Sequence, residues 1–210
     1  MIPTKICGIT NLDDANVAVE NGASAIGFIF YEKSPRTISI NNAKSISKHL
    51  PKTIARVGVF VNHEKDFINE AISEVPLDMI QLHGDETPDF CNQFDVAILK
   101  ALRIKNEASL SVMDQYDVAV FLLDTFSNDQ YGGTGETFDW SVLNRKFKTP
   151  IILSGGLNPE NILDAIDAVN PSAVDVNSGV ESSPGKKDFN KLKLLFKNLN
   201  KTQSTGFQFG

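Results

Sequence analysis

Eight short apolar runs recur along this 210-residue chain at intervals of roughly 20 to 30 residues. A strand, a loop and a returning helix together need about that length, so each interval accommodates one βα unit. Most of the runs are rich in Val, Ile and Phe and are continuous, which is typical of parallel strands buried on both faces. The predicted strands are Thr4–Ile6, Ala25–Phe30, Arg56–Val61, Met79–Leu82, Val96–Leu99, Val118–Leu123, Ile151–Leu153 and Ala173–Val176.

Helical patterns lie between these runs, most clearly over residues 67–75 and 162–169, where apolar residues repeat at helical spacing. Asn21–Gly22 predicts a left-handed helix end, and Asn158–Pro159 predicts an N-cap followed by proline at the first helical position. A last helix is predicted to start at Asp188 and to bury Phe189, Leu192, Leu195, Phe196 and Leu199.

Eight such units can close into a barrel or lie open as a doubly wound sheet. The glycine clusters favour the barrel, because they follow the sixth, seventh and eighth predicted strands and not the first, where a nucleotide-binding sheet would carry them. We therefore predict an α/β fold, a single (β/α)8 TIM barrel, over residues 1–200. Residues 201–210 show no period and are interpreted as a C-terminal tail, disordered or derived from cloning.

Composition excludes several classes of function. The formal net charge of −6 argues against a nucleic-acid partner, which a basic stripe would bind. No run approaches the roughly 20 apolar residues that span a bilayer, and no basic-then-apolar leader opens the chain. Cys7 and Cys91 are too few for a disulfide framework, which fits a reducing compartment. We expect a soluble cytoplasmic protein, monomer or homodimer, without a membrane partner.

The ends of the first and sixth strands carry the candidate catalytic residues. Barrel enzymes place catalytic groups at the carboxyl ends of strands, and Cys7 follows the first strand. Lys5 lies two residues earlier on the same face, so its ammonium is predicted to lower the thiol pKa and to favour the thiolate that a base requires. The alternative for Cys7 is a small buried hydrophobic residue.

Asp124 directly follows six apolar residues, and a carboxyl group there is costly unless it is solvated, paired or used. It is the candidate general acid, with an N-cap or a loop salt bridge as the alternative. Arg36, after the second strand, could hold a carboxylate through two hydrogen bonds, or it could simply be solvated. His83, at the end of the fourth strand, could contact the substrate or be a structural imidazole.

Two glycine loops predict a phosphate site. Gly155 and Gly156 follow the seventh strand and offer bare backbone N–H groups before a helix, while Ser178 and Gly179 follow the eighth. Either loop alone could be an ordinary turn, but barrels often bind phosphate at these two positions. His49, His63 and His83 show no metal-ligand spacing, so a metal mechanism is not expected.

The motifs of this chain resemble those of phosphoribosylanthranilate isomerases. They follow one another in the same order as in that family and cover roughly residues 3 to 199. The opening Lys5–Thr10 is the most specific of them. The others are Gly27–Phe30, Ser34–Arg36, Gly58–Val61, Gln81–Gly84, Leu123–Asp124, Gly132–Gly135, Phe138–Trp140, Ser154–Leu157 and Asp175–Glu181.

The resemblance implies an Amadori rearrangement of N-(5-phosphoribosyl)anthranilate to 1-(2-carboxyphenylamino)-1-deoxyribulose 5-phosphate in tryptophan biosynthesis. In this reading Asp124 protonates the ring oxygen of the sugar and Cys7 removes the C2′ proton. No cofactor is implied, because the protonated imine of the substrate accepts the electrons. Arg36 is implied to hold the anthranilate carboxylate.

The same resemblance places the phosphate at the Gly155–Gly156 and Ser178–Gly179 loops, and the substrate-binding set also includes Lys5, His83 and Gly133. The family commonly has two serines where this chain has Asn177–Ser178, and an asparagine can still donate to phosphate. The residues alone leave two alternatives open. One is a barrel acting on another phosphorylated sugar, and the other is a non-catalytic module that binds a phosphorylated ligand.

Overall fold

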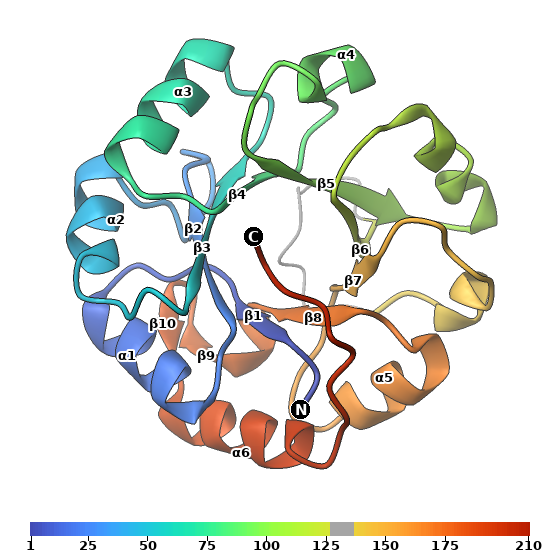
Figure 1. Cartoon of the computed structure of the whole chain (residues 1–210). Coiled ribbons are helices and arrows are strands. Elements are labelled where there is room, and N and C mark those ends of the chain that lie inside the picture. Colours follow the sequence, from blue (N-terminus) through green and yellow to red (C-terminus); the bar gives the residue numbers. More distant parts are fainter. Residues whose placement is uncertain (127–136) are drawn as a thin grey trace.

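The structure is a computed structural model that describes residues 1–126 and 137–210. Within them, eight parallel strands close into a barrel in which each strand pairs with its neighbours in sequence and β1 pairs with β8. Helices and short helical turns surround the barrel (Figure 1). The predicted fold, an α/β (β/α)8 barrel, is therefore confirmed.

The predicted strands lie where the apolar runs placed them, and four of them have the predicted bounds. The observed strands are β1 (Thr4–Ile6), β2 (Ala25–Ile29), β3 (Ala55–Phe60), β4 (Met79–Leu82), β5 (Ala97–Ile104), β6 (Val120–Thr125), β7 (Ile151–Leu153) and β8 (Ala173–Val176).

β5 is the strand that differs most from its prediction, because it continues to Ile104 and not only to Leu99. The apolar run stops at the charged residue Lys100, so the hydrophobic pattern that predicts a strand ends there. Lys100 is buried, however, and its ammonium lies 2.8 Å from a carboxylate oxygen of Glu86 and donates to two backbone carbonyls. A paired cation can therefore occupy a buried strand position.

The connections carry six α-helices and four 3₁₀ turns among the described residues. The α-helices are α1 (Leu12–Asn21), α2 (Ile40–Ser47), α3 (Lys65–Glu74), α4 (Pro88–Cys91), α5 (Ile162–Val169) and α6 (Phe189–Leu199). The 3₁₀ turns are η1 (Glu107–Leu110), η2 (Met113–Gln115), η3 (Trp140–Leu143) and η4 (Ser178–Val180), and a small hairpin is formed by β9 (Glu181–Ser183) and β10 (Lys186–Lys187).

Two of the three predicted helix ends are confirmed and one is wrong. Gly22 ends α1 with a φ of 114°, as predicted. Asp188 caps α6 as predicted, but Phe189 is 43% exposed and not buried, because it occupies the first position of the helix, before the helix reaches the barrel. The prediction for Asn158 was wrong, since α5 starts only at Ile162. Asn158 instead accepts hydrogen bonds from the backbone of the turn that precedes the helix.

The core has two main parts. The larger one lies between the outer face of the barrel and the helices, and the smaller one fills the barrel interior near the amino ends of the strands. Inward positions alternate along each strand, so the inward row on β4 reads Met79, Gln81, His83 and the row on β6 ends with Leu122 and Asp124. The rows begin apolar and end polar, which places the polar side chains at the carboxyl end of the barrel.

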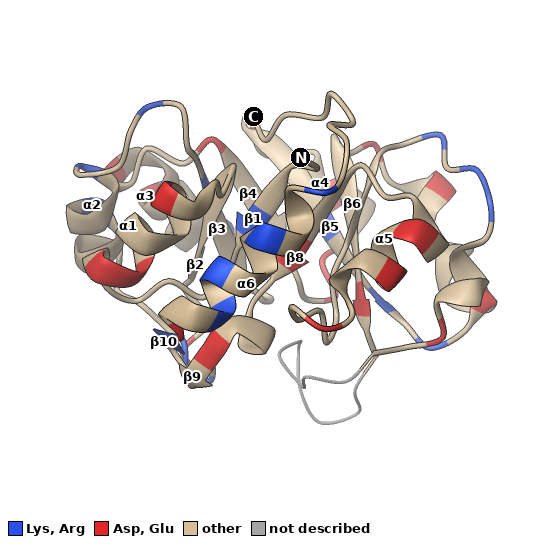
Figure 2. Ribbon diagram, turned by 90° about the horizontal axis from the view of Figure 1, so that it is seen from below, with Lys and Arg blue, Asp and Glu red and all other residues tan. Residues whose placement is uncertain are grey.

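Charged residues of both signs lie on the outside of the barrel. Figure 2 shows basic positions along α6 and acidic positions on the neighbouring α5. These are Lys191, Lys193 and Lys197 on α6, and Asp164 and Asp167 on α5. Among the described residues, the helices are all too short or too polar to cross a membrane.

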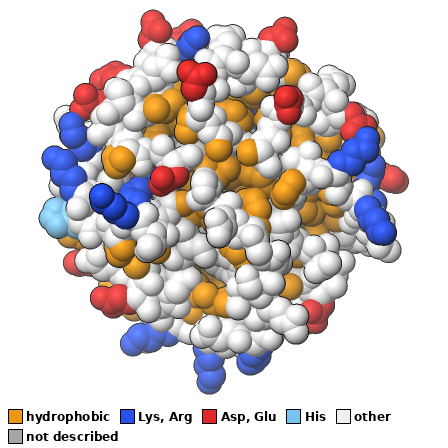
Figure 3. Space-filling view, viewed as in Figure 1, with side chains coloured by type: hydrophobic (Ala, Val, Ile, Leu, Met, Phe, Trp, Pro, Cys, Tyr) orange, Lys and Arg blue, Asp and Glu red, His pale blue; other side chains and the backbone are white. Residues whose placement is uncertain are grey.

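The tail after Asn200 is packed, and this corrects the expectation of a disordered segment. It crosses the amino-terminal end of the barrel, and the C-terminus lies over the middle of that end (Figure 1). Phe209 is only 7% exposed and joins the interior cluster of the barrel, with Phe207 half-buried beside it. Apolar side chains are visible across the middle of this face with the tail in place (Figure 3). The surface that the two rings cover is the interior cluster, which includes Ala25, Val57 and Met79.

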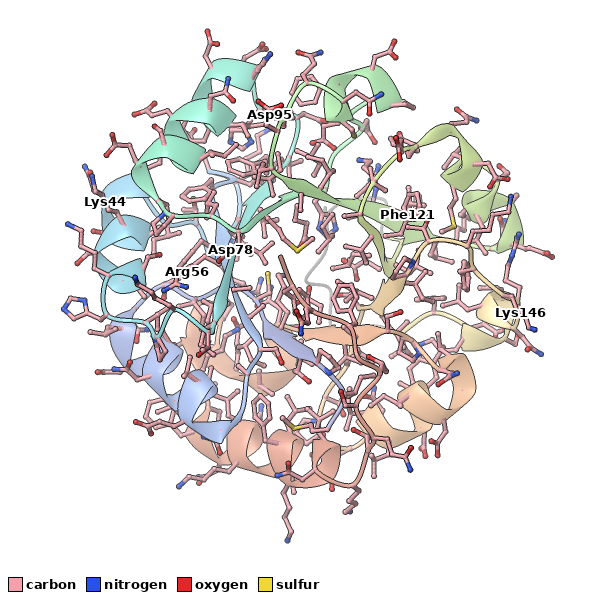
Figure 4. All side chains as sticks on the ribbon, viewed as in Figure 1. Lys44, Arg56, Asp78, Asp95, Phe121 and Lys146 are labelled. Atoms are coloured by element: carbon pink, nitrogen blue, oxygen red, sulfur yellow. The ribbon has the colours of Figure 1, made fainter. Side chains whose placement is uncertain are left out.

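The last residue of the tail lies against Asp78, just before β4. A Cβ added to Gly210 would approach the Asp78 Cβ to 2.9 Å. Figure 4 labels Asp78 beside Arg56 of β3, and Asp78 accepts a 2.7 Å hydrogen bond from the Arg56 backbone N–H. The tail therefore ends on the segment that aligns the starts of two barrel strands.

Replacing Phe209 with alanine is expected to lower the free energy of unfolding by about 2 kcal/mol, the usual value of burying one aromatic side chain. Activity should be unchanged, because the ring lies at the opposite end of the barrel from the polar residues. Urea denaturation of both proteins measures the effect. Phe189→Ala is the matched control, since that ring is 43% exposed. Equal losses from the two variants would show that the tail does not seal the barrel.

Candidate active site

A pocket opens at the polar carboxyl end of the barrel, lined by side chains and loops that follow the barrel strands. Seven of the predicted site residues line it. They are Cys7, Arg36, His83, Asp124, Gly155, Gly156 and Ser178. Of the other three, Lys5 and Gly179 lie outside the pocket wall, and Gly133 lies outside the described residues, with its neighbours Gly132 and Gly135.

Lys5 is fully buried in the barrel beneath the pocket. Its ammonium donates to Asp175 on the adjacent β8 and to Gln81 on β4, both at 2.9 Å. Lys5 and Asp175 are direct partners in the register of β1 and β8, which explains how the two charges meet. A buried ammonium is stable only with such partners.

The sequence predicts that Lys5 lowers the pKa of the Cys7 thiol, but the net pKa shift has the opposite direction. Lys5 does lower the pKa of the Cys7 thiol, but burial is the larger influence and raises it, and the negative charge of Asp175 raises it further. The thiol pKa is therefore above its ordinary value. The predicted direction was wrong because burial of the thiol, with the charge of Asp175 added to it, outweighs the effect of Lys5. In the free protein Cys7 is a protonated thiol near neutral pH.

Alkylation of Cys7 by iodoacetamide is expected to accelerate continuously as pH rises past about 8.5, where an ordinary thiol is half ionised. A raised pKa means that the thiolate fraction is still increasing there. The measurement uses a Cys91→Ala background, so that Cys7 is the single cysteine. A rate that levels off below pH 8 would contradict the assigned direction.

Asp124 lies at the end of β6 with both carboxyl oxygens facing neighbours. Oδ1 accepts a 2.8 Å hydrogen bond from the Thr125 backbone, and Oδ2 lies 3.3 Å from His83 Nε2. The adjoining Gly155 has a φ of 90°, and a Cβ there would come within 2.3 Å of Thr125 Oγ1. Glycine therefore allows the loop after β7 to lie directly against the acid.

Arg36 is buried and is held by Glu181, the first residue of β9. The Arg36 Nε and Nη2 atoms donate to the two carboxylate oxygens of Glu181 at 2.8 to 3.0 Å. No hydrogen bond within the described part of the chain uses Nη1, and Arg36 lines the pocket. One edge of the guanidinium is thus fixed by the protein, which orients the other donors for a ligand.

Replacing Glu181 with glutamine is expected to raise KM about tenfold with a smaller change in kcat. Loss of one charge-assisted contact is worth about 1.5 kcal/mol, and the loosened guanidinium would hold a substrate carboxylate less well. Steady-state kinetics measures the effect. Glu74→Gln is the control, because Glu74 forms an exposed ion pair with Lys44. An unchanged KM would remove Glu181 from the orientation of Arg36.

The two glycine loops meet at the mouth of the barrel. Gly155 and Gly156 both have positive φ, and no described group accepts from their N–H groups or from that of Ser178. Gly179 does not line the pocket, because it packs against the other loop, where a Cβ would lie 1.9 Å from the Leu157 carbonyl oxygen. Since α5 starts only at Ile162, the loop residues Gly155 and Gly156, and not the end of that helix, line the pocket.

Asn177, which departs from the family pattern, also lines the pocket. Its carbonyl oxygen Oδ1 accepts a 3.1 Å hydrogen bond from the buried Lys187. This contact orients the side chain so that Nδ2 is left as a donor, which suits an anionic ligand. No group of three or more His, Cys, Asp or Glu among residues 1–126 and 137–210 is arranged to hold a metal ion.

Three residues of the site were missed as functional candidates, although each stands in a motif. Gln81 and Asp175 are inward-facing strand residues, and Glu181 holds Arg36. Gln81 could have been found from its position, since it lies between Met79 and His83 on one inward row. The partners of Asp175 and Glu181 lie 170 and 145 residues away, so local sequence carries no signal for them.

The mouth of the closed barrel brings together a thiol, a carboxyl group, an arginine and two glycine loops. This arrangement is typical of (βα)8-barrel enzymes that act on small phosphorylated metabolites. The family model for N-(5'-phosphoribosyl)anthranilate isomerase matches residues 4–198. The chain belongs to this family of aldose–ketose isomerases of tryptophan biosynthesis.

Individual relatives agree with the family assignment. The N-(5'-phosphoribosyl)anthranilate isomerase of Geobacter sulfurreducens is 47% identical over 194 residues, covering 92% of this chain and 96% of that one. The crystal structure of the Thermotoga maritima enzyme has a TM-score of 0.89 at 44% identity, over 96% of this chain and 100% of that one. A phosphoribosyl anthranilate isomerase in complex with reduced 1-(O-carboxyphenylamino)-1-deoxyribulose 5-phosphate has a TM-score of 0.84 at 43% identity, with the same coverage.

Proposed function

We propose that Cys7 and Asp124 are the base and the acid with which this chain isomerises N-(5'-phosphoribosyl)anthranilate. The observation that carries the proposal is that both side chains line one pocket, from β1 and β6, at the carboxyl end of a closed barrel. An acid and a base must reach the same small sugar, and this arrangement lets them approach it from different sides.

The proposed reaction runs in three steps. Asp124 gives a proton to the ring oxygen of the sugar while the C1′–O bond breaks, which yields a protonated imine. Cys7 reacts as the thiolate, which its raised pKa makes the minor form near neutral pH, and removes the proton from C2′. The C–H electrons move toward the imine nitrogen to form an enolamine. The enolamine then takes a proton at C1′ and loses the proton of its C2′ hydroxyl, which leaves the ketone. The substrate nitrogen is the electron acceptor, so the proposal includes no cofactor.

Two anchors hold the substrate in this proposal. Arg36 binds the anthranilate carboxylate through the donors that Glu181 leaves available. The N–H groups of Gly155, Gly156 and Ser178 bind the phosphate. Beside Cys7, an apolar wall formed by Ile29, Val59 and Tyr31 suits the aromatic ring.

Fluorescence of freshly formed phosphoribosylanthranilate tests the activity. We expect the protein to consume the compound, so that its fluorescence decays at a rate proportional to protein concentration. A ligand-binding module would instead change the fluorescence once, in proportion to the protein added, and a barrel specific for another sugar phosphate would leave it unchanged. Either of these results would overturn the proposed activity.

A cytoplasmic location is part of the proposal, because the two cysteines are free and the proposed base must remain reduced. The oligomeric state, monomer or homodimer, is measured by light scattering against the chain mass of 23.0 kDa.

A further inference from the structure

Gln81 and His83 form a chain of contacts between the two groups of the proposed reaction. Gln81 lies on β4 and His83 directly follows that strand on the same inward row, and they are almost completely buried, at 1% and 7% exposed. Lys5, which influences Cys7, contacts Gln81, and His83 contacts Asp124. The chain therefore runs from the side of the base to the acid.

The first contact fixes the side-chain amide of Gln81. Lys5 Nζ carries only donors, so the Gln81 atom that lies 2.9 Å from it must be the carbonyl oxygen. Asp175 also contacts this ammonium, which holds it in place. The other end of the amide is then the NH₂ group, which can only donate.

The second contact fixes the imidazole of His83. The Gln81 NH₂ group lies 2.8 Å from His83 Nδ1, and a donor can bond there only if Nδ1 has a free lone pair. Nδ1 is therefore unprotonated, and the single proton of the neutral ring lies on Nε2.

The third contact places that proton beside the acid. His83 Nε2 is buried and lies 3.3 Å from Asp124 Oδ2, at an angle that does not complete a hydrogen bond. We propose that Gln81, anchored by Lys5, is a positioning residue that holds His83 as the Nε2–H tautomer, so that Asp124 always faces a donor. The proposal rests on the proposed role of Asp124 as the general acid.

This tautomer decides where the proton of Asp124 can go. An imidazole is a stronger base than a carboxylate, so a free lone pair on Nε2 would take the proton and leave no acid for the sugar. With Nε2 already protonated, His83 has no lone pair facing Asp124 and cannot take this proton. When Asp124 becomes a carboxylate, the Nε2–H group can tighten onto it and stabilise the new charge.

The tautomer itself is the first measurement. Nitrogen NMR of protein labelled at its three histidines is expected to show His83 with a protonated Nε2 and an unprotonated Nδ1. Gln81→Glu should invert this pattern, because a carboxylate still accepts from Lys5 but requires a proton on Nδ1. Gln81→Met has neither group and should leave a mixture. A wild-type His83 protonated on Nδ1, alone or in addition to Nε2, would overturn the inference.

Kinetics shows whether the tautomer matters to the reaction. Gln81→Glu is expected to lower kcat at least about tenfold with little change in KM, since Gln81 does not hold the substrate anchors. If the effect passes through His83, Gln81→Glu should cost little more in a His83→Ala background. Equal losses with and without His83 would contradict the inference, and Gln81→Met supplies the same comparison if the added carboxylate prevents folding.

Two results separate the acid role of Asp124 from the positioning role of Gln81. Retained activity in Asp124→Asn would remove the acid assignment whatever the tautomer of His83. An inactive Asp124→Asn together with a fully active Gln81→Glu of inverted tautomer would leave the acid in place and reject the role of Gln81.

Discussion

Asp124→Asn is expected to lower kcat by at least about 100-fold, the usual contribution of a positioned acid or base. Asparagine has the same shape and can keep the contact of Oδ1 with the Thr125 backbone, so the loss would report the missing proton. The ring oxygen of the sugar would have to leave without protonation. Single-turnover decay of phosphoribosylanthranilate fluorescence measures the step directly.

The control for this variant is Asp95→Asn, an exposed residue in the loop before β5 that Figure 4 labels on the outside of the barrel. It should retain full activity. A near-normal rate for Asp124→Asn, with an unchanged melting curve, would show that the sugar ring is opened by another group.

Cys7→Ala is expected to reduce kcat by a similar factor, again at least about 100-fold, because no other side chain of the pocket is assigned to remove the C2′ proton. The loss should appear as retention of deuterium at C2′ of a labelled substrate as well as in the rate. Binding of the product should change little, since Cys7 does not belong to the anchors.

Cys91→Ala is the matched control for the loss of a thiol. Cys91 is also buried, at 1% exposed, but it lies in α4, and it should cost stability without changing the chemical step. If Cys7→Ala kept its activity, the base would have to be reassigned to another group of the pocket.

Most of the fold could be predicted from the sequence because the strands are continuous apolar runs at regular spacing. The prediction stopped short in β5, where a paired lysine interrupts the run, and it placed the start of α5 too early at Asn158. Proline after asparagine signals the start of a turn as well as of a helix. The packing of the tail was missed because Phe207 and Phe209 carry no period, and the interior cluster that they join is formed by seven distant strands, β2 to β8.

The candidate site was predicted in part, because strand ends show which residues face the barrel mouth. What the sequence could not supply were partners far apart in the chain. Burial, with the charge of Asp175 added to it, outweighs the effect of Lys5 on the Cys7 pKa, and Glu181 holds one edge of the Arg36 guanidinium. His83 was left between two roles, and its orientation by Gln81 became visible only when Lys5 was placed against the amide.

The pairing of Lys5 with Asp175 links catalysis to the completion of folding. Lys5 belongs to the first strand and Asp175 to the last, so the buried ammonium has no counter-charge until β8 docks beside β1. A chain that has assembled seven strands would still carry an unneutralised cation at its centre and only one of the two loops proposed to bind the phosphate. Recovery of activity during refolding is therefore expected to coincide with closure of the barrel between β8 and β1.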